Sequence, residues 1–115
     1  MVKREVVGAH FGLRDWLAQR VTAVIMAVYT VLILSVLIGV PRLDYWQWKV
    51  IWQTPVVQVA TLLFLVSMLF HAWIGIRNIF MDYVKDPALR LMLYVMVIGA
   101  LAWYGVWAIR ILWSV

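Results

Sequence analysis

The sequence predicts an all-α membrane domain with three transmembrane helices. Hydrophobic residues make up 67% of the 115 residues and charged residues only 13%, and the mean hydropathy is +0.97. Soluble domains do not have such a composition. Three runs without Asp, Glu, Lys or Arg cover residues 21–40, 56–76 and 91–109. Each run is long enough for one crossing, which takes roughly 17–25 residues, and the remaining residues are too few for a soluble core.

The distribution of positive charge predicts the orientation of these helices, because short cytoplasmic segments retain Lys and Arg. Seven basic residues lie in the N-terminal segment and the second connection and three on the opposite side: Lys3, Arg4, Arg14, Arg20, Arg77, Lys85 and Arg90 against Arg42, Lys49 and Arg110. We therefore expect one domain, 1–115, with a cytoplasmic N-terminal segment over 1–20 and a periplasmic C-terminus. The expected transmembrane helices cover about 21–40, 56–79 and 88–110.

Charge and cysteine content exclude several classes of protein. The net charge of +5 follows from topology, and we expect no nucleic-acid binding because the basic residues are scattered at helix ends. The absence of cysteine excludes disulfides, thiolate-bound iron–sulfur clusters and thioether-attached haem in this chain. The first apolar run starts late and no small-residue cleavage site follows it, so we expect no signal peptide.

The segment before the first apolar run is polar enough to lie at the membrane surface. We expect a short interfacial helix through GLRDWLAQR, with Trp16 at headgroup depth. Arg20 stands directly before the first span, so its guanidinium could reach anionic groups near the cytoplasmic face. The alternative is an arginine that snorkels to lipid phosphates. Thr22 carries little information, because a hydroxyl can bond its own helix.

The first connection, PRLDYWQWKVIWQTP, is marked at both ends by proline. Its aromatic residues predict an outer aromatic belt, which the third helix could continue. The belt residues are Tyr45, Trp46, Trp48 and Trp52, followed by Trp103, Trp107 and Trp113. Small residues in the third helix could permit close helix approach, namely Gly99, Ala102 and Gly105.

A stripe of polar and small residues runs along the second predicted helix. At about 100° per residue, one face of this helix carries Phe64, Ser67, His71, Gly75, Asn78 and Asp82. A polar side chain that faces hydrocarbon costs a few kcal/mol. We therefore expect this stripe to face protein.

His71 is the histidine that we expect inside the membrane. Neutral imidazole is a good ligand for haem iron, and Gly75, one turn away, leaves room for a flat macrocycle. The alternative is a buried histidine bonded to a neighbouring helix. The other histidine, His10, precedes the membrane, so a six-coordinate haem would take its second ligand from another chain. The predicted fold class therefore includes membership of a heteromeric helix bundle.

A polar group follows where the second helix should leave the membrane. Asp82, Tyr83, Lys85 and Asp86 precede Pro87, which ends the turn. As a plain interfacial loop these residues need no function. The phenol of Tyr83 could instead donate to an amphipathic ligand such as a quinone at the membrane boundary, and Asp82 could hold that phenol or relay protons.

Most of the chain resembles the small cytochrome b membrane anchors of succinate dehydrogenase, the respiratory complex II. The resemblance rests on GLRDWLAQRVTA, on HAWIG around His71, on Asp82-Tyr83-Val84-Lys85 and on PALRLML. It implies that His71 binds the iron of a haem b as one of its two axial ligands, and that this haem is shared with a second anchor subunit. It also implies that Tyr83 hydrogen-bonds ubiquinone and that Arg20 lies near the haem propionates and the quinone pocket. Arg77 and Asn78 occupy positions where the family varies, so no role is carried over to them.

The resemblance implies a membrane anchor subunit of succinate:ubiquinone oxidoreductase, an enzyme of the tricarboxylic acid cycle and electron transport, in a bacterial inner membrane. The implied partners are a second cytochrome b anchor subunit, an iron–sulfur subunit, a flavoprotein subunit and the lipid bilayer. The chain is not catalytic alone, because dicarboxylate oxidation belongs to the flavoprotein. Alternatives are the anchor of a fumarate reductase, a small membrane transporter, and an assembly anchor without cofactor. The transporter would need an acidic residue within a span, and none of the three runs contains Asp or Glu.

Overall fold

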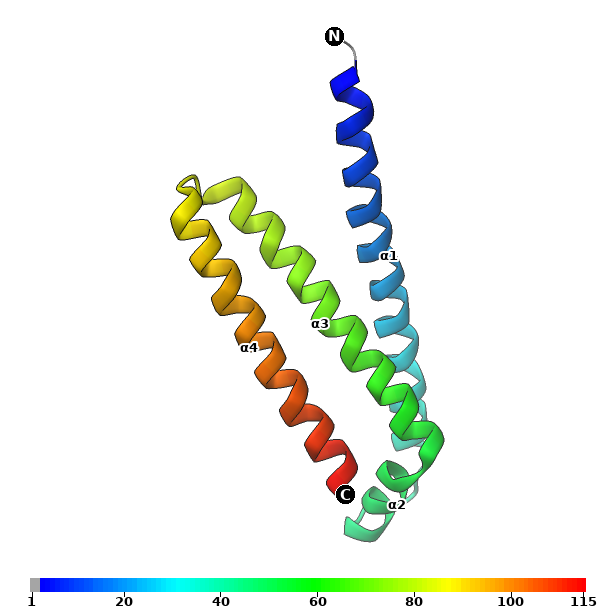
Figure 1. Cartoon of the computed structure of the whole chain (residues 1–115). Helices are drawn as coiled ribbons and strands as arrows, with labels where there is room; N and C mark the ends of the chain where they lie inside the picture. The colour runs from blue at the N-terminus through cyan, green and yellow to red at the C-terminus, as the bar shows by residue number, and fades with distance from the viewer. Residues whose placement is uncertain (1–2) are drawn as a thin grey trace.

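The computed structural model describes the backbone of residues 3–115 and the side chains from Leu13 on. Within this part of the chain it contains four α-helices and no strand: α1 (Lys3–Ile38), α2 (Tyr45–Gln53), α3 (Pro55–Tyr83) and α4 (Pro87–Ser114). α1, α3 and α4 are long, and α2 is a short helix between α1 and α3 (Figure 1). The predicted all-α class is confirmed.

Three helices are long and apolar enough to span a bilayer. The candidate spans are Leu13–Ile38, Pro55–Tyr83 and Pro87–Ser114, with 26, 29 and 28 residues. At about 1.5 Å per residue these lengths correspond to roughly 40 Å, which exceeds the hydrocarbon thickness of about 30 Å. The structure thus bears out three membrane-spanning helices, and each helix includes residues outside the apolar run that predicted it.

The N-terminal segment does not form the separate interfacial helix that we expected. Residues 12–20 are the middle of α1, which continues without interruption through Arg20 to Ile38. No proline occurs in this stretch, so a polar segment and an apolar segment can share one helix. In Figure 1 the N-terminal end of α1 extends beyond the turn that joins α3 to α4.

The first connection contains a helix that the sequence analysis missed. The Asp44 carboxylate caps α2 by accepting a hydrogen bond from the backbone N–H of Gln47 at 2.9 Å. An Asp followed three residues later by Gln is a recognisable start signal for a helix. α2 ends at Gln53, and Pro55 begins α3 at a position where its missing N–H is not needed. The expected belt residues Tyr45, Trp46 and Trp48 are all exposed.

α3 is the central helix of the bundle, with α1 packed on one side and α4 on the other (Figure 1). α3 and α4 meet through two aromatic pairs, with ring centroids 5.7 Å apart for Trp73 and Tyr94 and 6.0 Å apart for Phe80 and Tyr94. The C-terminus lies beside α2, where Gln53 Nε2 donates to the backbone carbonyl of Val115 at 3.1 Å. α3 therefore positions every other element.

Close approach between α3 and α4 depends on Gly105, one of the two glycines of α4 that the sequence singles out. A Cβ added at Gly105 would lie 2.9 Å from Cδ1 of Leu69, so only a glycine lets the Leu69 side chain keep its place. At Gly99 an added Cβ would meet nothing within 4 Å among the described residues. The prediction of close approach is confirmed for Gly105, and for Gly99 it stays a prediction.

The burial pattern is that of a lipid-embedded bundle. Among residues 13–115 the buried side chains are three apolar and three polar ones: Ile51, Ile74, Leu112, Thr22, Thr61 and Ser67. Most of the large apolar side chains on α1, α3 and α4 face outward. Helices that are apolar all round are suited to lipid, and their association relies on close packing and on polar contacts between helices.

Candidate functional site

Polar side chains connect α1 to α3 at intervals of seven residues along α1. Seven residues are close to two helical turns, so the three α1 residues share one face and are spaced by roughly 10 Å. The three contacts, counted from the N-terminal end of α1, are Asp15 with Arg77, Thr22 with His71, and Tyr29 with Thr61. α1 thereby supplies partners for polar groups of α3 that would otherwise face hydrocarbon.

His71 is hydrogen-bonded to α1 through one ring nitrogen. Its Nδ1 lies 2.9 Å from Oγ1 of Thr22, which is only 7% exposed. The Thr22 hydroxyl also lies 2.7 Å from the backbone carbonyl oxygen of Ala18, and it donates its single proton there. The hydroxyl oxygen therefore accepts from His71, which assigns the imidazole proton to Nδ1. Nε2 carries the free lone pair, and it makes no hydrogen bond to any residue from Leu13 on.

From Phe64 to Gly75 the stripe on α3 faces protein, as the sequence predicted, and part of that protein is this chain's own α1. Ser67 is buried at 5% exposure, and Phe64 stacks on Tyr29 with ring centroids 4.6 Å apart. A Cβ added at Gly75 would lie 3.7 Å from Nε2 of Gln19. This is an ordinary van der Waals distance to the end of a flexible side chain, so the expectation that Gly75 leaves room for a flat macrocycle stays a prediction.

Asp82 and Tyr83 form the exposed end of α3. Tyr83 is the last residue of the helix and is 80% exposed, and Asp82 is exposed beside it. Twelve residues of continuous helix separate His71 from Tyr83, which corresponds to roughly 18 Å along the axis. The two predicted site residues thus lie on one rigid element but at two separate places, one inside the bundle and one at its rim.

Arg20 lies on α1 away from the contact with α3. It lies two positions before Thr22, so the two side chains point about 200° apart around the helix. The Arg20 side chain is exposed, and its guanidinium carbon lies 5.2 Å from the ring centroid of Trp16. This cation–π contact holds the guanidinium near the aromatic ring. No hydrogen bond or ion pair among residues 13–115 joins Arg20, His71 and Tyr83 to one another.

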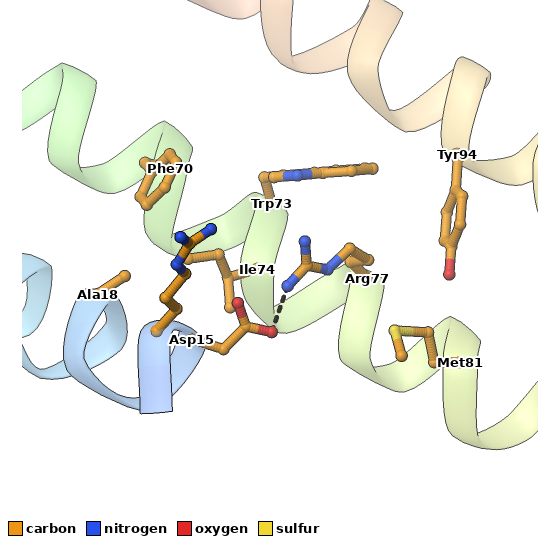
Figure 2. A pocket seen from close by; sticks show the side chains of 9 residues that line it. Asp15, Ala18, Phe70, Trp73, Ile74, Arg77, Met81 and Tyr94 are labelled. Carbon is orange, nitrogen blue, oxygen red and sulfur yellow. Dashed lines mark hydrogen bonds and ion pairs between the residues drawn. The ribbon is translucent and has the colours of Figure 1, made fainter. Parts of the chain in front are cut away.

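A groove of about 690 Å³ between α1, α3 and α4 contains none of the predicted site residues. Figure 2 shows Arg77 of α3 reaching Asp15 of α1 in an ion pair, with Trp73 and Tyr94 on the α4 side of the groove. Its α3 residues lie roughly 60° to 160° around the helix from His71. No motif in the sequence points to Arg77. The one available signal is the seven-residue spacing of Asp15, Thr22 and Tyr29, which places these three side chains on the face of α1 that packs against α3.

The fold and the histidine site define the class of protein: a multi-pass, all-α membrane subunit that presents one imidazole nitrogen between two helices. The family model described as succinate dehydrogenase/fumarate reductase transmembrane subunit matches residues 2–107. The succinate dehydrogenase hydrophobic membrane anchor subunit of Coxiella burnetii (strain RSA 493 / Nine Mile phase I) is 40% identical over 102 residues, which are 89% of each chain. This chain therefore belongs to the family of succinate dehydrogenase/fumarate reductase transmembrane subunits, as a membrane anchor subunit. The predicted resemblance is confirmed, and the haem and quinone roles stay predictions.

Proposed function

We propose that this chain is the small anchor of a succinate:ubiquinone oxidoreductase, in which it provides one axial ligand of a shared haem b and part of the ubiquinone reduction site. The hydrogen bond between Thr22 and His71 carries the haem part of this proposal, because it leaves Nε2 with a free lone pair. Family membership supports the anchor role. The exposed position of Tyr83 at the end of α3 supports the quinone role.

His71 Nε2 is the proposed ligand of the haem iron. Neutral imidazole with its proton on Nδ1 and a free pair on Nε2 is the form that binds iron. From Leu13 on, no three His, Asp or Glu side chains come together, and a haem needs only one nitrogen from this chain. When bound, haem supplies a one-electron redox centre. The second axial ligand comes from the other cytochrome b anchor, because His10 precedes the candidate span Leu13–Ile38.

Tyr83 is the proposed donor to a carbonyl oxygen of ubiquinone. A phenol at the end of a membrane-spanning helix lies at the depth where the head of an amphipathic quinone meets water. Asp82, one residue earlier and also exposed, can hold that phenol or pass on a proton. Arg20 is proposed to lie near the haem propionates and the quinone pocket, since its exposed guanidinium forms no ion pair with a carboxylate from residue 13 on.

The arrangement of the helices supports a cytoplasmic N-terminus. α1 and α3 are antiparallel, so the N-terminal part of α1 and the turn between α3 and α4 lie at the same end of the bundle (Figure 1). That end carries the larger share of Lys and Arg, which cytoplasmic segments retain. The Tyr83 end then faces the iron–sulfur and flavoprotein subunits, and the flavoprotein, not this chain, oxidises succinate.

A fumarate reductase anchor is the second candidate, because the family that matches this chain includes fumarate reductases by its own description. Such an anchor would use the same helices to oxidise quinol instead of reducing quinone. The sequence motifs favour the dehydrogenase through the combination of His71 with Asp82 and Tyr83. A transporter or a cofactor-free anchor has no observation in its favour.

Deletion of this chain from the assembled complex tests the proposed function. We expect loss of succinate-driven quinone reduction and release of succinate dehydrogenase activity from the membrane, measured with an artificial acceptor that takes electrons at the flavoprotein. Re-expression of the chain should restore both. Quinone reduction that persists at the membrane without this chain would contradict the proposal, and quinol-driven fumarate reduction faster than the reverse reaction would favour the second candidate.

A further inference from the structure

We propose that Thr22 is a positioning residue for the haem ligand: its hydroxyl holds the Nδ1–H of His71 and so presents Nε2 to the iron in a fixed orientation. This inference rests on the proposed role of His71. It adds a residue whose side chain touches the proposed ligand, His71. The contact joins two helices, because Thr22 lies on α1 and His71 on α3.

The number of protons on the Thr22 hydroxyl decides the direction of the contact. A threonine hydroxyl donates one proton and accepts with its lone pairs. Its oxygen lies 2.7 Å from the carbonyl oxygen of Ala18 and 3.2 Å from that of Gln19, and neither carbonyl can donate. The proton is thus committed to the helix backbone, and the 2.9 Å contact with His71 must use the proton on Nδ1.

The position of the hydroxyl is fixed by its surroundings. Thr22 is buried, and a β-branched side chain that bonds the carbonyl four residues earlier has its χ1 angle set by that bond. The two neighbouring contacts between α1 and α3 lie about two helical turns to either side, and they hold the two helices in register. The imidazole ring therefore cannot turn about χ2 without losing its only hydrogen bond to residues 13–115.

This arrangement has a consequence for the iron. A group that accepts from the remote N–H of a metal-bound histidine fixes the ring and raises the basicity of the ligand, and its loss typically lowers metal affinity about 10- to 100-fold. A more basic ligand favours ferric over ferrous iron. Since a hydroxyl is neutral, it supports the imidazole without removing its proton. Loss of the hydroxyl should therefore raise the midpoint potential of the haem and weaken its retention.

The test uses variants of Thr22 in the complete complex. Thr22→Val keeps the shape and removes the hydroxyl, while Thr22→Ser and Thr22→Ala are both smaller than threonine and differ from each other in the hydroxyl. Tyr29→Phe is the matched control, because it removes the hydroxyl that lies 2.6 Å from Thr61 in the same interface but two turns away from His71. Two readouts are the haem midpoint potential and the ferric low-spin EPR signal. The third is the amount of haem that the complex retains, expressed per flavin, after incubation with a protein that takes up free haem.

We expect Thr22→Val and Thr22→Ala to raise the midpoint potential of the haem, to change the EPR signal and to lose haem about 10- to 100-fold more readily. Thr22→Ser and Tyr29→Phe should behave like the parent. Equal haem potentials and EPR signals in Thr22→Ala and Thr22→Ser would overturn the inference, because loss of the hydroxyl would then have no effect. A shift of the same size in Tyr29→Phe would also overturn it, by assigning the effect to packing of α1 on α3. Failure of the proposed function is distinguishable, since His71→Ala would then leave the low-spin haem unchanged whatever the Thr22 variants do.

Discussion

Replacing Tyr83 by phenylalanine removes one hydroxyl from the last residue of α3 and tests the quinone role without disturbing the fold. Tyr83 is 80% exposed, and none of the hydrogen bonds among residues 13–115 uses its hydroxyl. The end of α3 is closed by the backbone N–H of Val84, which donates to the carbonyl of Phe80 at 2.9 Å, and the substitution keeps that bond. We therefore expect a fully assembled complex with a normal haem content.

The expected effect on quinone binding follows from the loss of one neutral hydrogen bond. Such a bond contributes about 0.5 to 1.5 kcal/mol net, so the affinity for quinone should fall roughly two- to tenfold. The substitution keeps the aromatic ring, which is exposed, so no packing loss adds to this figure. A much larger loss of turnover would mean that the hydroxyl also stabilises reduced quinone or helps to deliver protons.

The assay compares two acceptors in the same preparation. Succinate-driven quinone reduction should show a raised KM for quinone and a weaker response to quinone-site inhibitors. Succinate oxidation by an artificial acceptor at the flavoprotein should not change, because that reaction does not reach the membrane. Unchanged KM and unchanged inhibitor affinity would refute the reasoning, and Tyr83 would then be an interfacial anchor only.

Two further predictions concern orientation and packing. Single cysteines at residues 3 and 115 of this cysteine-free chain should be labelled from the cytoplasmic and the periplasmic side respectively, and periplasmic labelling at residue 3 would reverse the orientation. Arg77→Met should lower the free energy of unfolding by no more than about 1 kcal/mol. The ion pair between Arg77 and Asp15 is about a third exposed, so solvent screens it. The haem spectrum of this variant should not change, and loss of the low-spin signal would instead place Arg77 in the haem site.

The sequence was sufficient for the parts of the fold that depend on composition and on one helix at a time. Charge-free runs of about 20 residues predict the spans because a bilayer sets their length. The stripe through Ser67 and His71 predicts a face turned toward protein because polar groups avoid lipid. α2 was also predictable, since Asp44 and Gln47 form a start signal within the segment that Pro41 and Pro55 bound.

The contacts between helices could not be predicted, because they depend on the register of α1 against α3. Thr22 on its own indicates only a hydroxyl that bonds its own helix, and the structure shows that it bonds both its own helix and His71. Arg77 carries no motif, and it has a partner only because antiparallel packing brings Asp15 beside it. The regular spacing of Asp15, Thr22 and Tyr29 was visible, but a seven-residue spacing on one helix does not identify the facing residues.

The haem spectrum of the complex that carries His71→Ala tests the central claim most directly. The measurement is the reduced-minus-oxidised visible spectrum together with the ferric EPR signal, at equal amounts of all subunits as checked on a gel. With Nε2 of His71 as an axial ligand, the low-spin signal should disappear or convert to high-spin, because five-coordinate iron remains. An unchanged low-spin spectrum in a fully assembled complex would contradict the account, since the iron would then have both of its axial ligands elsewhere.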